Sequence, residues 1–161
     1  MSLKDTMTWL EHLPLSVSIA EASLTFPLLE TLHVLALAIV VGSIAMIDVR
    51  LLGLGGRKRA VSELIATVLP WTWMAFAVTV AAGLLMFISR ATMYYENLPF
   101  RFKMVFLALA GINMLTFHLV TARGIASWDR SEPPLPARVA GALSLTLWVS
   151  VVTAGRWIGF V

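Results

Sequence analysis

Cysteine is absent from this 161-residue chain, and charged side chains are scarce. Without cysteine, the protein has no disulfide, no thiolate metal ligand and no cysteine nucleophile. Asp, Glu, Lys and Arg make up 13% of the residues, against about 25% in a typical soluble domain. Apolar residues make up 59%, and the mean hydropathy is +0.87. Because a small soluble domain cannot bury so much apolar surface, the composition excludes a soluble enzyme and a disordered tail, and predicts a small integral membrane protein.

The sequence also lacks the motifs of common hydrolases and nucleotide-binding proteins. It contains no Ser-His-Asp arrangement, no phosphate-binding glycine loop and no His-Glu zinc pair at i, i+4 spacing. The net charge of +3 is typical of membrane topology rather than of nucleic-acid binding. We therefore expect a lipid bilayer, and no nucleic acid, as the partner of this chain.

Four long apolar stretches dominate the sequence. Each reaches the ~20 residues that cross ~30 Å of hydrocarbon as a helix, and spanning segments must be helical because their backbone finds no water there. We predict spanning helices at residues 26–49, 64–88, 102–121 and 139–161. Since short loops make successive helices antiparallel, the sequence predicts an all-α integral membrane fold, with residues 1–161 forming one domain: a four-transmembrane-helix up-down bundle.

The N-terminal segment, residues 5–24, is expected to lie in the membrane interface. Trp9, Leu10, Leu13 and other apolar residues alternate there with polar ones, which is typical of an interfacial amphipathic helix. Pro14 interrupts it. No basic stretch precedes a short apolar core, so we do not predict a cleaved signal peptide.

The basic residues predict the orientation in the membrane. We call the face at which the first spanning helix begins side A, and the opposite face side B. Seven of the twelve Lys and Arg residues fall on side B, and two of the others, Lys103 and Arg156, lie inside spans on side A. Cytoplasmic loops carry an excess of Lys and Arg. We therefore predict a bacterial inner-membrane protein with side B cytoplasmic and both termini periplasmic.

Ionisable residues inside apolar spans are costly and are therefore candidates for function. Glu30 and His33 are three residues apart, so they share one helix face near side A. Lys103 opens the third span and Arg156 ends the fourth, at a similar depth. A neutral imidazole is a common ligand of metals and haem iron. His33 is therefore a candidate ligand of haem iron or of another metal, with Lys103 or Arg156 near the propionates of a haem. The alternative is that His33 only hydrogen-bonds to a neighbouring helix.

The other two histidines are weaker candidates. At 1.5 Å per residue, His33 and His118 lie ~10–15 Å apart along the membrane normal, whereas two ligands of one metal ion lie ~4 Å apart. We therefore expect no bis-histidine haem site and place His118 near side B, beside Asp48, with a hydrogen-bonding role. His12 belongs to the N-terminal segment and is expected to be exposed.

Two methionines lie at the depth of His33. Met86 ends the second span and Met104 begins the third, and a thioether is a soft ligand that suits haem iron or Cu(I). Most methionines in a membrane protein only fill gaps, however. The copper hypothesis thus uses His33, Met86 and Met104. Small residues that are expected to let helices approach closely include Gly42, Gly83, Gly111 and Gly141.

Several motifs resemble a family of bacterial four-helix membrane proteins of unknown function. They are Leu29-Glu30-Thr31-Leu32-His33-Val34, then Val41-Gly42-Ser43, Pro70-Trp71-Thr72-Trp73, Phe100-Arg101-Phe102-Lys103-Met104 and Gly155-Arg156-Trp157. More distantly, the His-then-Gly helix and the Lys that opens the third helix are similar to copper-resistance D proteins and to the haem-containing four-helix protoporphyrinogen oxidase. In that oxidase family a transmembrane His and a Lys are functional, and the resemblance implies His33 and Lys103 in these roles.

Three functional hypotheses stay open. The first is a haem b redox module, an oxidoreductase or electron carrier that exchanges electrons with quinone or with a periplasmic partner. The second is a copper-binding or copper-transport protein. The third is a structural or accessory subunit without cofactor, in which the polar residues fix helix register. Small bundles commonly form homodimers, but no motif here specifies one.

Overall fold

The computed structural model describes residues 2–54 and 60–160. Its long helices are α3 (Thr25–Leu51), α4 (Val61–Ser89), α6 (Leu98–Thr116) and α7 (Leu135–Trp157). These four helices, with the short continuations of α6 and α7, are long and apolar enough to cross a membrane. The described residues contain no strand. The predicted all-α fold with four membrane-spanning helices is therefore confirmed.

The helices begin where capping groups allow rather than where the apolar pattern begins. α6 and α7 begin before the predicted spans, which start at residues 102 and 139. α6 starts at Leu98, because the Asn97 side chain accepts a hydrogen bond from the Phe100 amide at 2.9 Å, which satisfies a free N–H of the first turn. α7 starts at Leu135 with a proline in its first turn, where the missing N–H is not needed. The apolar pattern marks the part of each helix in hydrocarbon, and the caps mark its ends.

α3 ends in a glycine-dependent turn on side B. Gly53 has a φ of +84°, a conformation that residues with a Cβ rarely adopt. Its amide donates to the Arg50 carbonyl at 3.1 Å, and the Leu54 amide donates to the Val49 carbonyl at 3.1 Å. This pair of hydrogen bonds is the Schellman motif that closes many helices. The basic stretch 57–59, which contributes to the predicted charge of side B, lies outside the described residues, as does residue 161.

The third spanning segment changes its helical form near side B. α6 continues as a π-helix, η1 (Phe117–Thr121), and then as a 3₁₀-helix, η2 (Ala122–Ser127), so the helical segment runs past the predicted end at residue 121. Asp129 follows, and its carboxylate accepts hydrogen bonds from the Ser62 hydroxyl at 2.6 Å and the Ser62 amide at 2.8 Å. These two bonds hold the pKa of Asp129 below its ordinary value and attach this loop to the start of α4.

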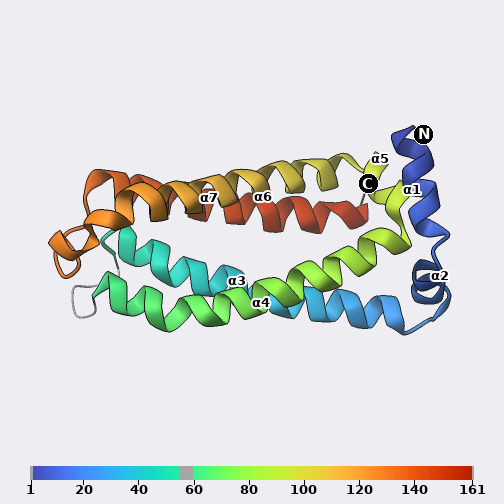
Figure 1. The fold of residues 1–161 in the computed structure, drawn as a ribbon, viewed down its shortest axis with the longest axis horizontal. Coiled ribbons are helices and arrows are strands. Elements are labelled where there is room, and N and C mark those ends of the chain that lie inside the picture. The colour runs from blue at the N-terminus through green and yellow to red at the C-terminus, as the bar shows by residue number, and fades with distance from the viewer. Residues whose placement is uncertain (1, 55–59, 161) are drawn as a thin grey trace.

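The N-terminal segment forms two short helices instead of one. α1 (Leu3–Glu11) and α2 (Pro14–Glu21) cover the end of the bundle at which both chain termini lie (Figure 1). The break falls where Pro14 opens α2, because proline fits the first turn of a helix and disrupts its interior. Trp9 and Leu15 are more than half exposed. An interfacial position of this segment stays a prediction.

A short helix, α5 (Ala91–Glu96), occupies a connection that the sequence predicts to be a loop. Its first turn is capped from α1: the Glu11 carboxylate accepts hydrogen bonds from the Thr92 amide at 2.8 Å and from the Thr92 hydroxyl at 3.2 Å. Lys4 of α1 also forms an ion pair of 2.8 Å with Glu96. The sequence of α5 is too short for its apolar pattern to predict a helix. Contacts from α1, a distant segment of the chain, stabilise this helix.

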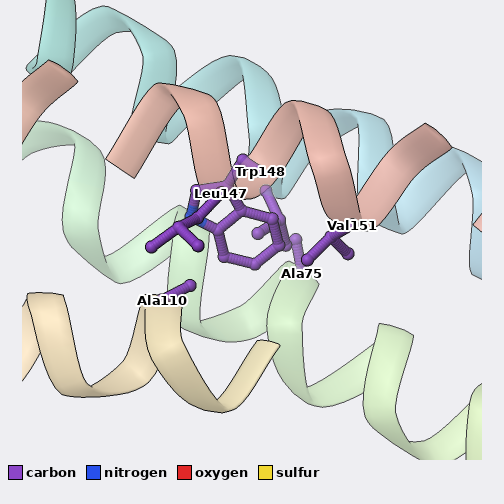
Figure 2. Packing of buried hydrophobic residues seen from close by; sticks show 6 residues of the cluster. Ala75, Ala110, Leu147, Trp148 and Val151 are labelled. Carbon is purple, nitrogen blue, oxygen red and sulfur yellow. The ribbon is translucent and has the colours of Figure 1, made fainter. Parts of the chain in front are cut away.

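The bundle consists of two helix pairs, α3 with α4 and α6 with α7, which join along α3 and α7 (Figure 1). α4 and α6 do not pack closely against each other. The core between the pairs contains Val40 from α3 and the residues Ala75, Ala110, Leu147, Trp148 and Val151. Figure 2 shows the Trp148 indole beside the small side chains of Ala75 and Ala110. Large aromatic and small side chains thus fill the core together.

The outer surface of the bundle is apolar. Leu28, Leu35 and Ile112 are 66%, 61% and 59% exposed, and many other large apolar side chains on the spanning helices share this exposure. A soluble monomer rarely presents so large an apolar surface. The exposed surface and the four spanning helices describe a multi-pass membrane protein in a lipid bilayer.

Only some of the glycines permit close helix contacts. A Cβ at Gly141 of α7 would lie 3.0 Å from the Leu51 Cβ and 3.1 Å from the Asp48 carbonyl oxygen of α3, so the two helices touch there. Gly42 and Gly111 have no atom within 4 Å of an added Cβ. The expectation that these two glycines bring helices together is wrong, because their missing side chains face open space.

Candidate functional site

His33 lies on the inward face of α3, near the end of the bundle that carries the termini. It is partly buried, and Ala36 and Val40 on the same face are fully buried. Its Nδ1 atom lies 2.8 Å from the carbonyl oxygen of Thr79 on α4. A Cβ at Gly83 would lie 3.1 Å from Cε1 of the ring. The ring is therefore held between a carbonyl and a glycine of the neighbouring helix.

The hydrogen bond fixes the protonation of the His33 ring. A carbonyl oxygen only accepts, so Nδ1 must carry the proton that it donates. In a neutral imidazole the other nitrogen, Nε2, then keeps its lone pair. Histidines that bind metals commonly donate their second ring N–H to a carbonyl or carboxylate in this way. His33 is thus held in the tautomer that leaves the lone pair on Nε2.

Lys103 approaches the same region from α6. Its side chain passes over Gly155 of α7, where an added Cβ would lie 3.6 Å from Nζ. Lys103 is partly buried and acts electrostatically on the His33 ring. Within residues 2–54 and 60–160, Nζ forms no hydrogen bond or ion pair. The amine therefore has no ion-pair partner among the described residues at this end of the bundle.

Glu30 lies one turn before His33 on α3 and is exposed at the end of the bundle. It acts electrostatically on the His33 ring and on Tyr94 of α5. Arg90, at the end of α4, also affects Tyr94 and lies over the Phe26 ring at 4.4 Å. Burial raises the pKa of the Tyr94 phenol, so this group stays protonated near neutral pH.

Aromatic side chains close the bundle near His33. The Tyr94 ring lies 5.2 Å from the Phe100 ring, and the Phe100 ring lies 5.6 Å from Phe87, measured between centroids. These residues come from α5, α6 and α4. The Asn97 amide also donates to the Ile158 carbonyl at 3.2 Å, which attaches the start of α6 to the end of α7. Together these contacts join the ends of α4, α5, α6 and α7 at the end of the bundle where His33 lies.

The structure brings Glu30, His33 and Lys103 to one end of the bundle and places the other predicted site residues differently. Arg156 is exposed, and its guanidinium lies over the Phe160 ring at 4.8 Å. Met104 is 47% exposed on the outer surface, whereas Met86 is partly buried. Arg156 and Met104 thus point away from the bundle interior in which His33 lies.

The remaining histidines do not share the surroundings of His33. His118 is exposed, and its Nδ1 atom bonds to the Met114 carbonyl of its own helical segment at 2.9 Å. It lines the same cavity as Asp48, which agrees with its predicted depth. His12 is exposed and bonds to the Thr8 carbonyl at 2.7 Å.

Three parts of the site were not predicted from the sequence. They are the Thr79 carbonyl, the absence of a side chain at Gly155, and the Tyr94–Arg90 pair beside Glu30. Every residue has a backbone carbonyl, so the sequence does not mark the one that bonds to His33. The direction in which Gly155 faces depends on the rotation of α7 about its axis. The sequence offers one usable signal, which is that Gly83 and Gly155 interrupt apolar spans near side A.

Residues 20–161 match the family DUF6644, described as a family of unknown function. The chain belongs to this family. The DUF6644 match includes all four spanning helices together with Glu30, His33 and Lys103. No curated protein and no solved structure matches the chain. The predicted membership in a four-helix family of unknown function is thereby confirmed, and the comparisons give no support to the more distant resemblance to copper-resistance D proteins or to the oxidase.

Proposed function

We propose that this DUF6644 protein binds haem b through His33 and works as a membrane redox module. The observation that carries the proposal is the hydrogen bond from His33 Nδ1 to the Thr79 carbonyl. It leaves Nε2 with a lone pair, and it holds the ring against rotation. A ligand that is oriented before binding loses less conformational entropy when it binds.

Lys103 supports haem rather than a bare metal ion. A cation inside an apolar bundle is costly unless an anion accompanies it, and the described residues offer Lys103 no ion pair. Haem b carries two propionates, which are anions of the required kind. Lys103 would pair with one of these propionates. The Arg156 guanidinium, in contrast, lies over the Phe160 ring.

The donor set also favours a cofactor that brings most of its own ligands. No three His, Cys, Asp or Glu side chains in the described ranges are grouped so that they could hold a metal ion. A haem iron takes four ligands from the porphyrin and needs one or two from the protein. The copper hypothesis requires both methionines beside His33, and Met104 is 47% exposed on the outer surface.

When bound, haem b supplies one-electron oxidation and reduction. In this proposal His33 binds and orients it, Lys103 neutralises its charge, and the cluster of Phe87, Tyr94 and Phe100 keeps water away. With the predicted orientation, the site lies near the periplasmic face of a bacterial inner membrane. The electron partner is then a quinone in the bilayer or a periplasmic redox protein.

An optical spectrum tests the proposal. The protein is expressed with a haem precursor and copper supplied, purified in mild detergent, and examined for a Soret band and for metal content. We expect a Soret band that His33→Ala abolishes and that Lys103→Gln weakens. The matched control is His118→Ala, which also removes a histidine with a carbonyl-bound Nδ1 but should leave the band unchanged.

Other outcomes would replace the proposal. Stoichiometric copper without a Soret band, lost in His33→Ala, would establish the copper hypothesis. Purified protein with neither haem nor copper would favour a structural or accessory role, in which the His33–Thr79 bond only sets the register of α3 and α4. A Soret band that persists in His33→Ala would show that another residue binds the iron.

A further inference from the structure

A second polar feature lies deeper in the bundle, in a cavity of about 230 Å³. All four spanning helices contribute to its walls, which are mainly apolar. The lining side chains include the aromatic rings of Trp73, Phe76, Phe117 and Trp148, together with the imidazole of His118. The cavity belongs to the side B half of the molecule, because Asp48 and Leu51 at the end of α3 line it.

The enclosure of the cavity bears on how a ligand would reach it. It is only partly enclosed, and α4 and α6 both line it although they do not pack closely against each other. Figure 1 shows the two helix pairs to which they belong. An opening between these two helices would face the acyl chains of a bilayer. A ligand would therefore enter from the hydrocarbon.

Asp48 is the unusual residue in this cavity. Asp48 is 4% exposed, and Ser144 of α7 lines the cavity with it. Its Oδ2 atom has no hydrogen-bond partner among the residues that the structure describes. None of the described basic side chains forms an ion pair with it. Buried polar atoms are nearly always hydrogen-bonded, so Oδ2 is left for a partner that the described residues do not supply.

We propose that this cavity binds a membrane-soluble organic cation, with its ammonium group on Asp48 and a ring-sized apolar body against the aromatic walls. A positive charge compensates a carboxylate that no described residue pairs with in a low-dielectric interior, although His118 lines the same cavity. The faces of aromatic rings also attract a desolvated cation. A neutral hydroxyl satisfies Oδ2 but leaves the negative charge of the carboxylate without compensation.

The volume limits the size of the bound group. An engineered lysozyme cavity of about 150 Å³ holds one benzene molecule. By that measure, a cavity of about 230 Å³ holds roughly nine non-hydrogen atoms, which corresponds to a benzylammonium head. A hydrocarbon tail would leave through the opening between α4 and α6 into the bilayer. The cavity is too small for a porphyrin.

This site is separate from the proposed haem site. His33 and Asp48 are fifteen residues apart on α3, which corresponds to roughly 22 Å along the helix. The cation proposal therefore does not rest on haem binding. A variant at Asp48 should leave any Soret band intact, so failure of one proposal is distinguishable from failure of the other.

The test uses the full chain in nanodiscs of neutral phosphatidylcholine and two radiolabelled probes of the same shape. 4-Butylbenzylamine, which is protonated at neutral pH, supplies the cation, and 4-butylbenzyl alcohol is its uncharged counterpart. Binding above that of empty nanodiscs is measured at neutral pH. We expect saturable binding of the ammonium probe, at least tenfold tighter than that of the alcohol.

Three variants locate the site. Asp48→Asn keeps the shape of the side chain, and should weaken ammonium binding at least tenfold while leaving binding of the alcohol unchanged. Glu63→Gln is the matched control, since it removes an exposed carboxylate from the same end of the bundle and should change nothing. Gly111→Leu should prevent binding of both probes without disrupting the fold, because an added Cβ there meets no atom within 4 Å.

Three results would overturn the proposal. One is the absence of saturable ammonium binding to the unmodified protein. Another is equal affinity for the ammonium and the alcohol, which would indicate a merely apolar cavity or a hydrogen-bonding ligand. The third is unchanged ammonium binding in Asp48→Asn, which would place the bound cation elsewhere on the protein.

Discussion

Replacement of Gly141 by alanine should destabilise the bundle at the point where α7 crosses α3. The added methyl group would lie 3.0 Å from the Leu51 Cβ and 3.1 Å from the Asp48 carbonyl oxygen. The second neighbour is backbone inside a long helix, so it cannot move away alone. The two helices must therefore separate by several tenths of an ångström along the contact that joins the two helix pairs.

The size of the effect follows from two opposing contributions. Alanine is favoured over glycine in a helix interior by about 0.5–1 kcal/mol, whereas overpacking a tight contact costs about 1–3 kcal/mol. Gly42→Ala, on an exposed face of α3 with no atom within 4 Å, gains only the first contribution. We therefore expect the unfolding free energy of Gly141→Ala to fall below that of Gly42→Ala by about 1–3 kcal/mol.

The measurement is reversible unfolding in mixed micelles with an increasing mole fraction of sodium dodecyl sulfate, followed by tryptophan fluorescence and circular dichroism. Comparison of the two variants removes the contribution of helix propensity, since both convert a helical glycine into alanine. If the two unfolding free energies agree within about 0.5 kcal/mol, a difference expected even of neutral surface changes, the close contact of α3 with α7 is refuted.

Three further predictions concern the ends of the bundle. Gly83→Ala should push the His33 ring away from its hydrogen-bonded position. The chemical shift of Nδ1 in ¹⁵N-labelled histidine should therefore change. An unchanged chemical shift would mean that the ring has room for the added methyl group. Asp129 has a lowered pKa in the folded protein, so its stabilising effect is present above its ordinary pKa of about 3.9 and is lost as pH falls through the lowered value. The unfolding midpoint should therefore fall less between pH 5 and pH 3 in Asp129→Ala than in the unmodified protein, and equal losses would contradict this. Glu11→Ala should remove the cap that α1 supplies to α5. Amide hydrogen exchange across residues 91–96 should then become faster, and unchanged exchange would contradict this.

Much of the architecture follows from the sequence because lipid imposes strong constraints. A run of about 20 apolar residues has few alternatives to a spanning helix, and the four predicted spans agree with α3, α4, α6 and α7 apart from their ends. The ends differ because capping contacts decide them. The Asn97 cap extends α6 toward the N-terminus, and the Glu11 carboxylate stabilises a helix in a segment that sequence alone indicates as a loop.

The candidate site was only partly predictable. Glu30 and His33 share a face because they are three residues apart on one helix, and Lys103 has a similar depth because it opens the next antiparallel span. Whether a side chain at that depth faces inward depends on the rotation of its helix. That rotation directs Lys103 toward Gly155, and it leaves Arg156 and Met104 on the outside.

The sequence by itself determined that this chain crosses a membrane four times and which ionisable groups lie within the apolar spans, since hydrophobicity and the rise of a helix depend only on residue order. The tertiary structure alone decided that the His33 ring donates to the Thr79 carbonyl and that Asp48 lines a cavity with an oxygen to which no described residue bonds. Both facts depend on contacts between helices. Such contacts are set by the packing of many side chains together, which no local pattern in the sequence encodes.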